Sequence, residues 1–215
     1  MMKISKLIGK IVIITIALLL FADKTEAQTE PNVQQKSQKK EQLAEQKLTN
    51  EQMKALLVVD IQNGLTERKD VYQISTVIEN VNYAIKKYRE KGYLIVFIQH
   101  NNVLLKNGSA KWMIDSRLDK AENDLVIQKS HGNAFGKTDL ENILREKNIE
   151  EIVVCGLVTH GCIKATSLGG LALGFKTSLL KNGHTNWNKN AAEKISSVES
   201  ELEQKGAIIL EKDNL

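Results

Sequence analysis

The stretch Ile152-Val153-Val154-Cys155-Gly156-Leu157-Val158-Thr159-His160-Gly161-Cys162-Ile163 decides how this 215-residue chain folds. An apolar run of strand length is followed by a tight turn, and Cys162 then opens what the pattern predicts to be a helix. A strand, a turn and a helix N-terminus therefore follow one another within this single stretch.

Cys162 is placed to act as a nucleophile. A thiol at a helix N-terminus sees unpaired backbone N–H groups and the positive end of the helix dipole, and both favour the thiolate. We therefore expect Cys162 to be partly ionised near neutral pH. The alternative is a small apolar residue that packs beneath the helix. The residues expected to lie near Cys162 favour the first interpretation.

Two charged residues also follow apolar runs of strand length. Asp60 follows Ala55 to Val59, and Lys129 follows Leu125 to Gln128. Open α/β sheets bind ligands beyond the C-terminal ends of their parallel strands, so Asp60, Lys129 and Cys162 could converge there. An Asp can take the thiol proton and return it to a leaving group, while a Lys ammonium can stabilise the thiolate. Together they form a complete set for acyl transfer.

Three motifs in this order resemble the isochorismatase-like cysteine hydrolases, which include nicotinamidases, N-carbamoylsarcosine amidases and related amide hydrolases. The motifs are Asp60-Ile61-Gln62-Asn63, then Lys129 with Ala134-Phe135-Gly136-Lys137-Thr138-Asp139-Leu140, then Gly156-Leu157-Val158-Thr159-His160-Gly161-Cys162. The likeness covers about residues 54 to 211. It implies that Asp60 is the general base, Lys129 the thiolate partner and Cys162 the nucleophile.

The same resemblance implies a cis peptide bond between Leu157 and Val158. Its implied use is to aim the Val158 amide, together with the Cys162 amide, at an oxyanion. The family likeness also suggests a homo-oligomer.

The sequence predicts neither a metal nor a cofactor. Nicotinamidases of this family bind a metal through an Asp and several His after the second strand. The matching stretch here is Gln99-His100-Asn101-Asn102, and no further His occurs before His131. None of the four His has a partner at ligand spacing. This departure also weakens the nicotinamidase assignment.

Residues 1–27 resemble a secretory signal peptide. Three lysines precede the uncharged, mostly apolar run from Ile11 to Ala22, and the small residue Ala27 lies at the expected cut. The competing interpretation is an uncleaved membrane anchor, but a span needs about 20 apolar residues. We expect an exported protein, periplasmic or secreted, with a membrane-anchored N-terminus as the alternative.

A polar tether follows the predicted leader. Residues 28–53 are rich in Gln, Lys and Glu, and the hydrolase domain is expected over residues 54–215. The whole chain has 30 Lys and Arg against 26 Asp and Glu, whereas residues 55–215 have 21 against 20. The folded part is thus near neutral, without the basic patch that a nucleic-acid partner would require.

Strands and helices alternate through the domain. This order predicts a three-layer α/β/α sandwich with a mostly parallel, doubly wound sheet of about six strands. The predicted strands are 55–60, 94–98, 125–128, the run that begins at 152, 176–180 and 207–210. The predicted helices are about 73–91, about 138–147 with Thr138 as N-cap and Glu141 completing a capping box, about 162–173, and 191–204.

Four residues are expected to line the substrate pocket. They are Gln62 in the turn after the first strand, His100 at the end of the second, Trp112 in the long loop 101–124, and Phe135 after Lys129. His100 ranks first among them as a substrate neighbour. Trp112 could instead be a lid residue that packs on the core.

Cys155 lies inside a predicted strand and should be a buried, inert thiol. A bridge to Cys162 would need the two Cα atoms within about 7 Å, so we expect no disulfide.

The predicted function is hydrolysis of an amide-type C–N bond of a small molecule through a thioester on Cys162. The cysteine argues against the vinyl-ether hydrolysis for which the family is named. The alternative is an exported small-molecule binding protein of the same fold without turnover.

Overall fold

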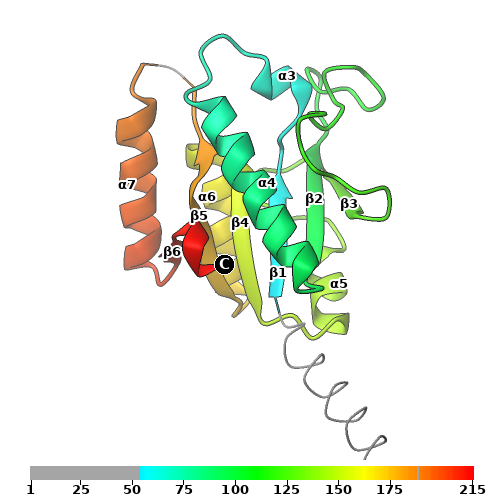
Figure 1. Cartoon of the computed structure of the whole chain (residues 1–215), viewed down its shortest axis with the longest axis vertical. Helices are drawn as coiled ribbons and strands as arrows, with labels where there is room; N and C mark the ends of the chain where they lie inside the picture. The colour runs from blue at the N-terminus through cyan, green and yellow to red at the C-terminus, as the bar shows by residue number, and fades with distance from the viewer. Residues whose placement is uncertain (1–53, 188) are drawn as a thin grey trace, which may run out of the picture. The chain divides into compact units, whose positions relative to one another are not determined.

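A computed structural model describes residues 54–187 and 189–215 (Figure 1). The predicted signal peptide and tether lie outside the described residues, and both stay predictions. Within the described part, no helix is both long enough and apolar enough to cross a membrane.

Six parallel strands form one sheet, in the order β3-β2-β1-β4-β5-β6. The chain moves outward from β1 to β3, then returns to the other side of β1 and continues outward to β6. The order therefore reverses between β1 and β4, the kind of switch point beyond which α/β proteins bind ligands. The strands are β1 (Lys54–Val59), β2 (Leu94–His100), β3 (Leu125–Lys129), β4 (Glu151–Leu157), β5 (Lys176–Thr185) and β6 (Ile208–Leu210).

Helices cover both faces of the sheet, so the predicted α/β/α arrangement is confirmed (Figure 1). Leu56 and Val58 of β1 face α4, while Leu57 and Val59 face the core shared with α5, α6 and α7. The helical segments are α3 (Asn63–Thr66), α4 (Ile74–Glu90), α5 (Leu140–Glu146), η1 (Thr159–Ile163), α6 (Lys164–Ala172), α7 (Ala191–Gln204) and η2 (Lys212–Asn214).

The structure differs from the predicted elements at several places, one of which is the helix expected from Cys162, because α6 begins at Lys164. A short helix, α3, occupies the turn after β1. The helix α5 begins at Leu140 with Asp139 as N-cap, one residue later than predicted, so Thr138 is not the N-cap of this helix. The Thr138 hydroxyl accepts from the Leu140 N–H at 3.3 Å, as a capping hydroxyl does, and donates to the Ala134 carbonyl at 2.6 Å. The strand β5 runs on to Thr185 because its register against β4 shifts between Val154 and Gly156.

Glycine permits the closest approach between the two central strands. Gly156 has φ +119°, and a Cβ built there would lie 1.9 Å from the Val59 carbonyl oxygen. In α6, a Cβ at Gly170 would lie 2.5 Å from Cδ1 of Ile152. Both glycines therefore let backbones pack closely, which brings α6 and β1 tightly around β4.

Candidate active site

The structure brings Asp60, Lys129 and Cys162 together at the C-terminal edge of the sheet. Asp60 follows β1, Lys129 ends β3, and Cys162 lies in the turn after β4. Lys129 Nζ lies 2.7 Å from Asp60 Oδ2 and 3.2 Å from Cys162 Sγ. The side chains of Asp60 and Lys129 are 2% and 0% exposed, so this ion pair is buried.

Two backbone features aim these side chains. Asp60 has φ +53°, a left-handed conformation that non-glycine residues rarely adopt, and its N–H donates to the Ile98 carbonyl. Lys129 pairs with His100 at the matching end of β2, which places β3 so that the lysine reaches towards β1. Unusual backbone conformations of this kind cluster at functional sites.

The Lys129 ammonium uses all three of its donors inside the site. Besides Asp60 and Cys162, it contacts His100 Nδ1 at 2.9 Å. An ammonium has no lone pair, so Nδ1 must be the acceptor and therefore carries no proton. We assign His100 as a neutral imidazole with its proton on Nε2. The sequence indicated that His100 lies near the substrate, but not that it contacts Lys129.

Burial dominates the ionisation of the site. It raises the pKa of Asp60, although the Lys129 ammonium opposes the rise. Burial also lowers the pKa of His100, and the charge of Lys129 lowers it further. A carboxylate with a raised pKa is better able to hold a proton, as a general base must.

The expectation that Cys162 is partly thiolate near neutral pH is wrong. Burial and the Asp60 carboxylate raise the pKa of Cys162 to about 12, and Lys129 offsets them only in part. The helix position counts for less than expected because α6 begins at Lys164, two residues after the thiol. Transfer of the thiol proton to Asp60 would leave the net charge of the buried site unchanged, and this is how the thiolate can form.

Iodoacetamide should alkylate Cys162 before Cys155, because Cys155 is fully buried and burial raises its pKa also. The rate at Cys162 should still rise about tenfold per pH unit between about pH 8 and about pH 10, since both values lie below its pKa. Peptide mass mapping across this range measures the profile. A plateau near neutral pH would show instead that the free enzyme holds a thiolate.

The turn that carries Cys162 is tightly wound. The Leu157–Val158 peptide bond is cis. The Val158 carbonyl accepts hydrogen bonds from the N–H groups of Gly161 and Ile163 at 2.9 and 3.2 Å. Thr159–Ile163 leads directly into α6, with a kink at Gly161, whose φ of −113° and ψ of −108° are not helical. Cys162 itself is only partly buried, so its sulfur can be reached.

Two of the predicted pocket residues, Gln62 and Phe135, make contacts with other parts of the protein. Gln62 is fully buried, and its side chain bonds only to main-chain atoms: the N–H and carbonyl of His100 and the carbonyl of Trp112. It therefore holds the end of β2 and the 101–124 loop in place. The ring of Phe135 stacks on Phe175 at 5.8 Å and packs against the core beside α5 and α6. Gln62 is thus a structural support, while Phe135 packs on the core with its side chain partly exposed.

Trp112 lies in the 101–124 loop, next to the end of β2. Its carbonyl accepts hydrogen bonds from Gln62 and Gln99, at 2.7 and 3.1 Å. Its side chain lines a hollow of about 400 Å³, together with Gln99 and Val126. The main chain of Trp112 is therefore held beside the end of β2.

Both cysteines are free thiols. Cys155 is fully buried inside β4, with its sulfur 3.5 Å from the Leu57 carbonyl.

A resident metal ion does not fit among these residues. Donor atoms of Asp60, His100 and Cys162 lie within 4.8 Å of one another, which is the right spacing for a metal. However, Lys129 Nζ contacts an atom of each at 2.7, 2.9 and 3.2 Å. The position that a cation would take is therefore filled by an ammonium that is itself positive.

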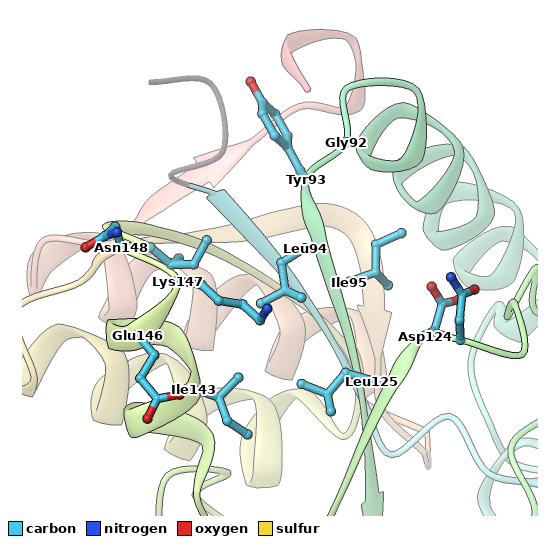
Figure 2. A pocket seen from close by; sticks show the side chains of 12 residues that line it. Gly92, Tyr93, Leu94, Ile95, Asp124, Leu125, Ile143, Glu146, Lys147 and Asn148 are labelled. Atoms are coloured by element: carbon cyan, nitrogen blue, oxygen red, sulfur yellow. The ribbon is translucent and has the colours of Figure 1, made fainter. Parts of the chain in front are cut away.

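A cavity of about 760 Å³ lies at the opposite edge of the sheet (Figure 2). Figure 2 shows its lining: the starts of β2 and β3, with Leu94 and Leu125, and the end of α5, with Glu146 and Lys147. None of the three converging side chains lines it. Its size therefore does not make it the reaction site.

Comparison with known proteins supports what the geometry indicates. The isochorismatase domain model matches residues 54–211. The chain belongs to the isochorismatase family. The predicted family, fold class and enzyme type are thereby confirmed, and the matched range is the one that the three motifs indicated.

Relatives in the family include named hydrolases. The streptothricin hydrolase of Streptomyces noursei is 25% identical over 148 residues, which cover 67% of this chain and 54% of that protein. The ureidoacrylate amidohydrolase RutB of Klebsiella pneumoniae is 26% identical over 162 residues, covering 57% and 69%. The crystal structure of the Pyrococcus horikoshii pyrazinamidase in complex with zinc matches with a TM-score of 0.66 and 25% identity, covering 74% and 99%.

Proposed function

We propose that this isochorismatase-family protein is a cysteine hydrolase that cleaves an amide-type C–N bond of a small molecule through a thioester. The observation that carries the proposal is the Lys129 ammonium, which contacts both the Asp60 carboxylate and the Cys162 sulfur in a buried site. A base, a nucleophile and a fixed positive charge are the parts that acyl transfer requires. The named amidohydrolases among the relatives support the same reaction.

In the acylation step, Cys162 Sγ attacks the amide carbon while its proton passes to Asp60. The S–C bond forms, and the carbonyl oxygen becomes an oxyanion that the backbone N–H groups of Val158 and Cys162 stabilise. Asp60 then returns the proton to the nitrogen as the C–N bond breaks. The amine leaves, and a thioester remains on Cys162.

In the deacylation step, a water molecule gives a proton to Asp60 and attacks the thioester carbon. The S–C bond breaks, and the acid is released. The proton on Asp60 returns to the sulfur, so the enzyme regains its starting state. Lys129 stabilises the negative charge on sulfur in both steps, because its Nζ keeps contact with Sγ.

His100 belongs to this reaction as a neutral donor. Its Nδ1 is occupied by Lys129, and its side chain remains 16% exposed. The Nε2–H therefore offers a hydrogen bond on the accessible side of the site, where the amide substrate binds. A neutral imidazole serves here because a second cation beside Lys129 would be unfavourable.

A panel of small amides, from nicotinamide to carbamoylated amino acids, tests the proposal. At least one amide should release its amine, and acid quenching should trap an acyl group on the peptide that contains Cys162. The variant Cys162→Ala should show neither product nor adduct. Product without any adduct would exclude the thioester, and no product from any amide would favour the binding-protein alternative.

Activity should survive dialysis against a chelator, because Lys129 already occupies the place between the donor atoms. The rate before and after dialysis should agree within about twofold, a difference below 0.5 kcal/mol in activation free energy. Loss on chelation with recovery on adding zinc or iron would contradict the metal-free mechanism.

Export of the enzyme is part of the proposal as well. It rests on the lysines and the apolar run of residues 1–27. The mass of the mature protein from the native cell would show whether the leader is removed.

A further inference from the structure

A buried histidine that the proposed reaction does not use contacts the turn that carries the nucleophile. His184 lies near the end of β5, and its side chain is 0% exposed. Its Nδ1 lies 2.9 Å from the hydroxyl of Thr159, which is also fully buried. Thr159 directly follows Val158, whose N–H is one of the two proposed oxyanion donors.

The other ring nitrogen faces an acidic side chain of α7. His184 Nε2 lies 3.3 Å from Glu199 Oε1, although the two atoms are not aligned for a full hydrogen bond. A carboxylate beside Nε2 favours the proton on that nitrogen. Nδ1 is then left as an acceptor for the Thr159 hydroxyl. Glu199 thus selects the tautomer that can hold Thr159.

This arrangement does not reach the reacting atoms. His184 and Glu199 line a hollow of about 240 Å³, together with Tyr72, Lys181 and Ser196. Asp60, Lys129 and Cys162 do not line this hollow. His184 therefore acts on the reaction only through Thr159, as a positioning residue.

The next residue of the turn has an anchor on the same segment. His160 Nδ1 lies 2.5 Å from Oδ1 of Asn186, two residues after His184. Asn186 is fully buried, and its carbonyl accepts from the Tyr72 N–H. Two successive residues of the turn are therefore tied to alternate residues at the end of β5.

We propose that Glu199, His184 and Thr159 form a positioning chain, in which the Glu199 carboxylate faces Nε2 of His184 and Nδ1 of His184 holds the Thr159 hydroxyl, and that this chain positions the oxyanion-binding amides of the nucleophile turn. The chain fixes the Thr159 side chain, and so the backbone between Val158 and Cys162. This inference rests on the proposed function. Its effect should fall on steps that form an oxyanion, and not on the reactivity of the sulfur itself.

Two thiol reagents separate these effects without a natural substrate. Acetylation of Cys162 by p-nitrophenyl acetate forms an S–C bond through an oxyanion, releases p-nitrophenolate and passes the thiol proton to Asp60. Alkylation by iodoacetamide forms an S–C bond and releases iodide, with no oxyanion. Thr159→Val should slow acetylation about tenfold, less than the hundredfold or more expected when a donor is removed outright. Alkylation should stay within about twofold of wild type, because the thiol, Asp60 and Lys129 are unchanged.

Conservative variants and controls complete the experiment. Thr159→Ser and His184→Asn keep the donor and the acceptor and should acetylate at close to the wild-type rate, whereas His184→Leu should slow acetylation as much as Thr159→Val does. Glu199→Gln should slow acetylation less, and Glu201→Gln, which loses its pairing with Lys164, should not slow it. Thr177→Val removes an equally buried hydroxyl of β5 and should lower stability without changing the acetylation rate.

The inference is overturned if Thr159→Val leaves acetylation unchanged, or if it slows acetylation and alkylation equally. A wild-type enzyme that is acetylated yet hydrolyses no amide of the panel contradicts the proposed function instead. In that case, the ratio of the acetylation rate to the alkylation rate would still test the positioning chain.

Discussion

Replacing Asp60 by Asn is expected to lower turnover by at least about a thousandfold, within the range that general acid–base groups contribute. An amide oxygen can still accept from Lys129, but it cannot take the thiol proton or return it to the leaving nitrogen. The far-UV circular dichroism should stay unchanged. The melting temperature should fall, because Lys129 loses its buried carboxylate partner.

Asp115→Asn is the matched control. Asp115 is also buried, at 4% exposed, and its carboxylate bonds to the Arg117 guanidinium at 2.6 and 2.9 Å, outside the converging set. Its loss should lower stability while leaving turnover per folded molecule in place. If Asp60→Asn keeps even about a tenth of the activity, the general-base role is rejected.

Gly156→Ala is expected to have the largest effect on stability. The added methyl group would lie 1.9 Å from the Val59 carbonyl oxygen, so β1 and β4 would have to separate at the centre of the sheet. The loss should exceed about 4 kcal/mol, a size reached only when a core is disrupted. Thermal unfolding should show a melting temperature lower by at least about 8 °C, or no soluble protein.

Gly206→Ala separates crowding from backbone conformation. Gly206 has φ +96°, yet nothing lies within 4 Å of a Cβ built there. Its substitution should cost only the conformational penalty of a left-handed residue, about 1 kcal/mol. Equal losses for Gly156→Ala and Gly206→Ala would mean that the close contact with Val59 is not what demands glycine.

Most of the fold could be predicted from local patterns. Apolar runs and the spacing of apolar residues in α4 predicted the alternation of strands and helices, and apart from the end of β5 the predicted ends lie within two residues of the observed ones. The predicted N-cap at Thr138 was one residue early, because α5 begins at Leu140 after Asp139, although the Thr138 hydroxyl still accepts from the Leu140 N–H. The extension of β5 was missed because a register shift depends on the partner strand β4.

The sequence predicted which residues meet at the candidate site, but it did not predict their ionisation. Asp60, Lys129 and Cys162 each follow or end a strand, so parallel strands bring them to one edge. The pKa of Cys162 is raised, whereas the sequence predicted a lowered one, because burial and Asp60 outweigh Lys129. Phe135 follows Lys129 closely in the chain, but its ring stacks on Phe175 of a distant segment.

The sequence by itself determined which residues reach the active edge, because strand ends depend on apolar runs, turns and glycines that are local. Only the tertiary structure decided what those residues do to one another. The three donors of Lys129 are shared among Asp60, Cys162 and His100, and the hydroxyl of Thr159 meets His184. Distances, burial and protonation at these contacts depend on side chains from separate strands. Local sequence patterns do not predict these properties, because they arise only when the sheet forms and water is excluded from the side chains at its edge.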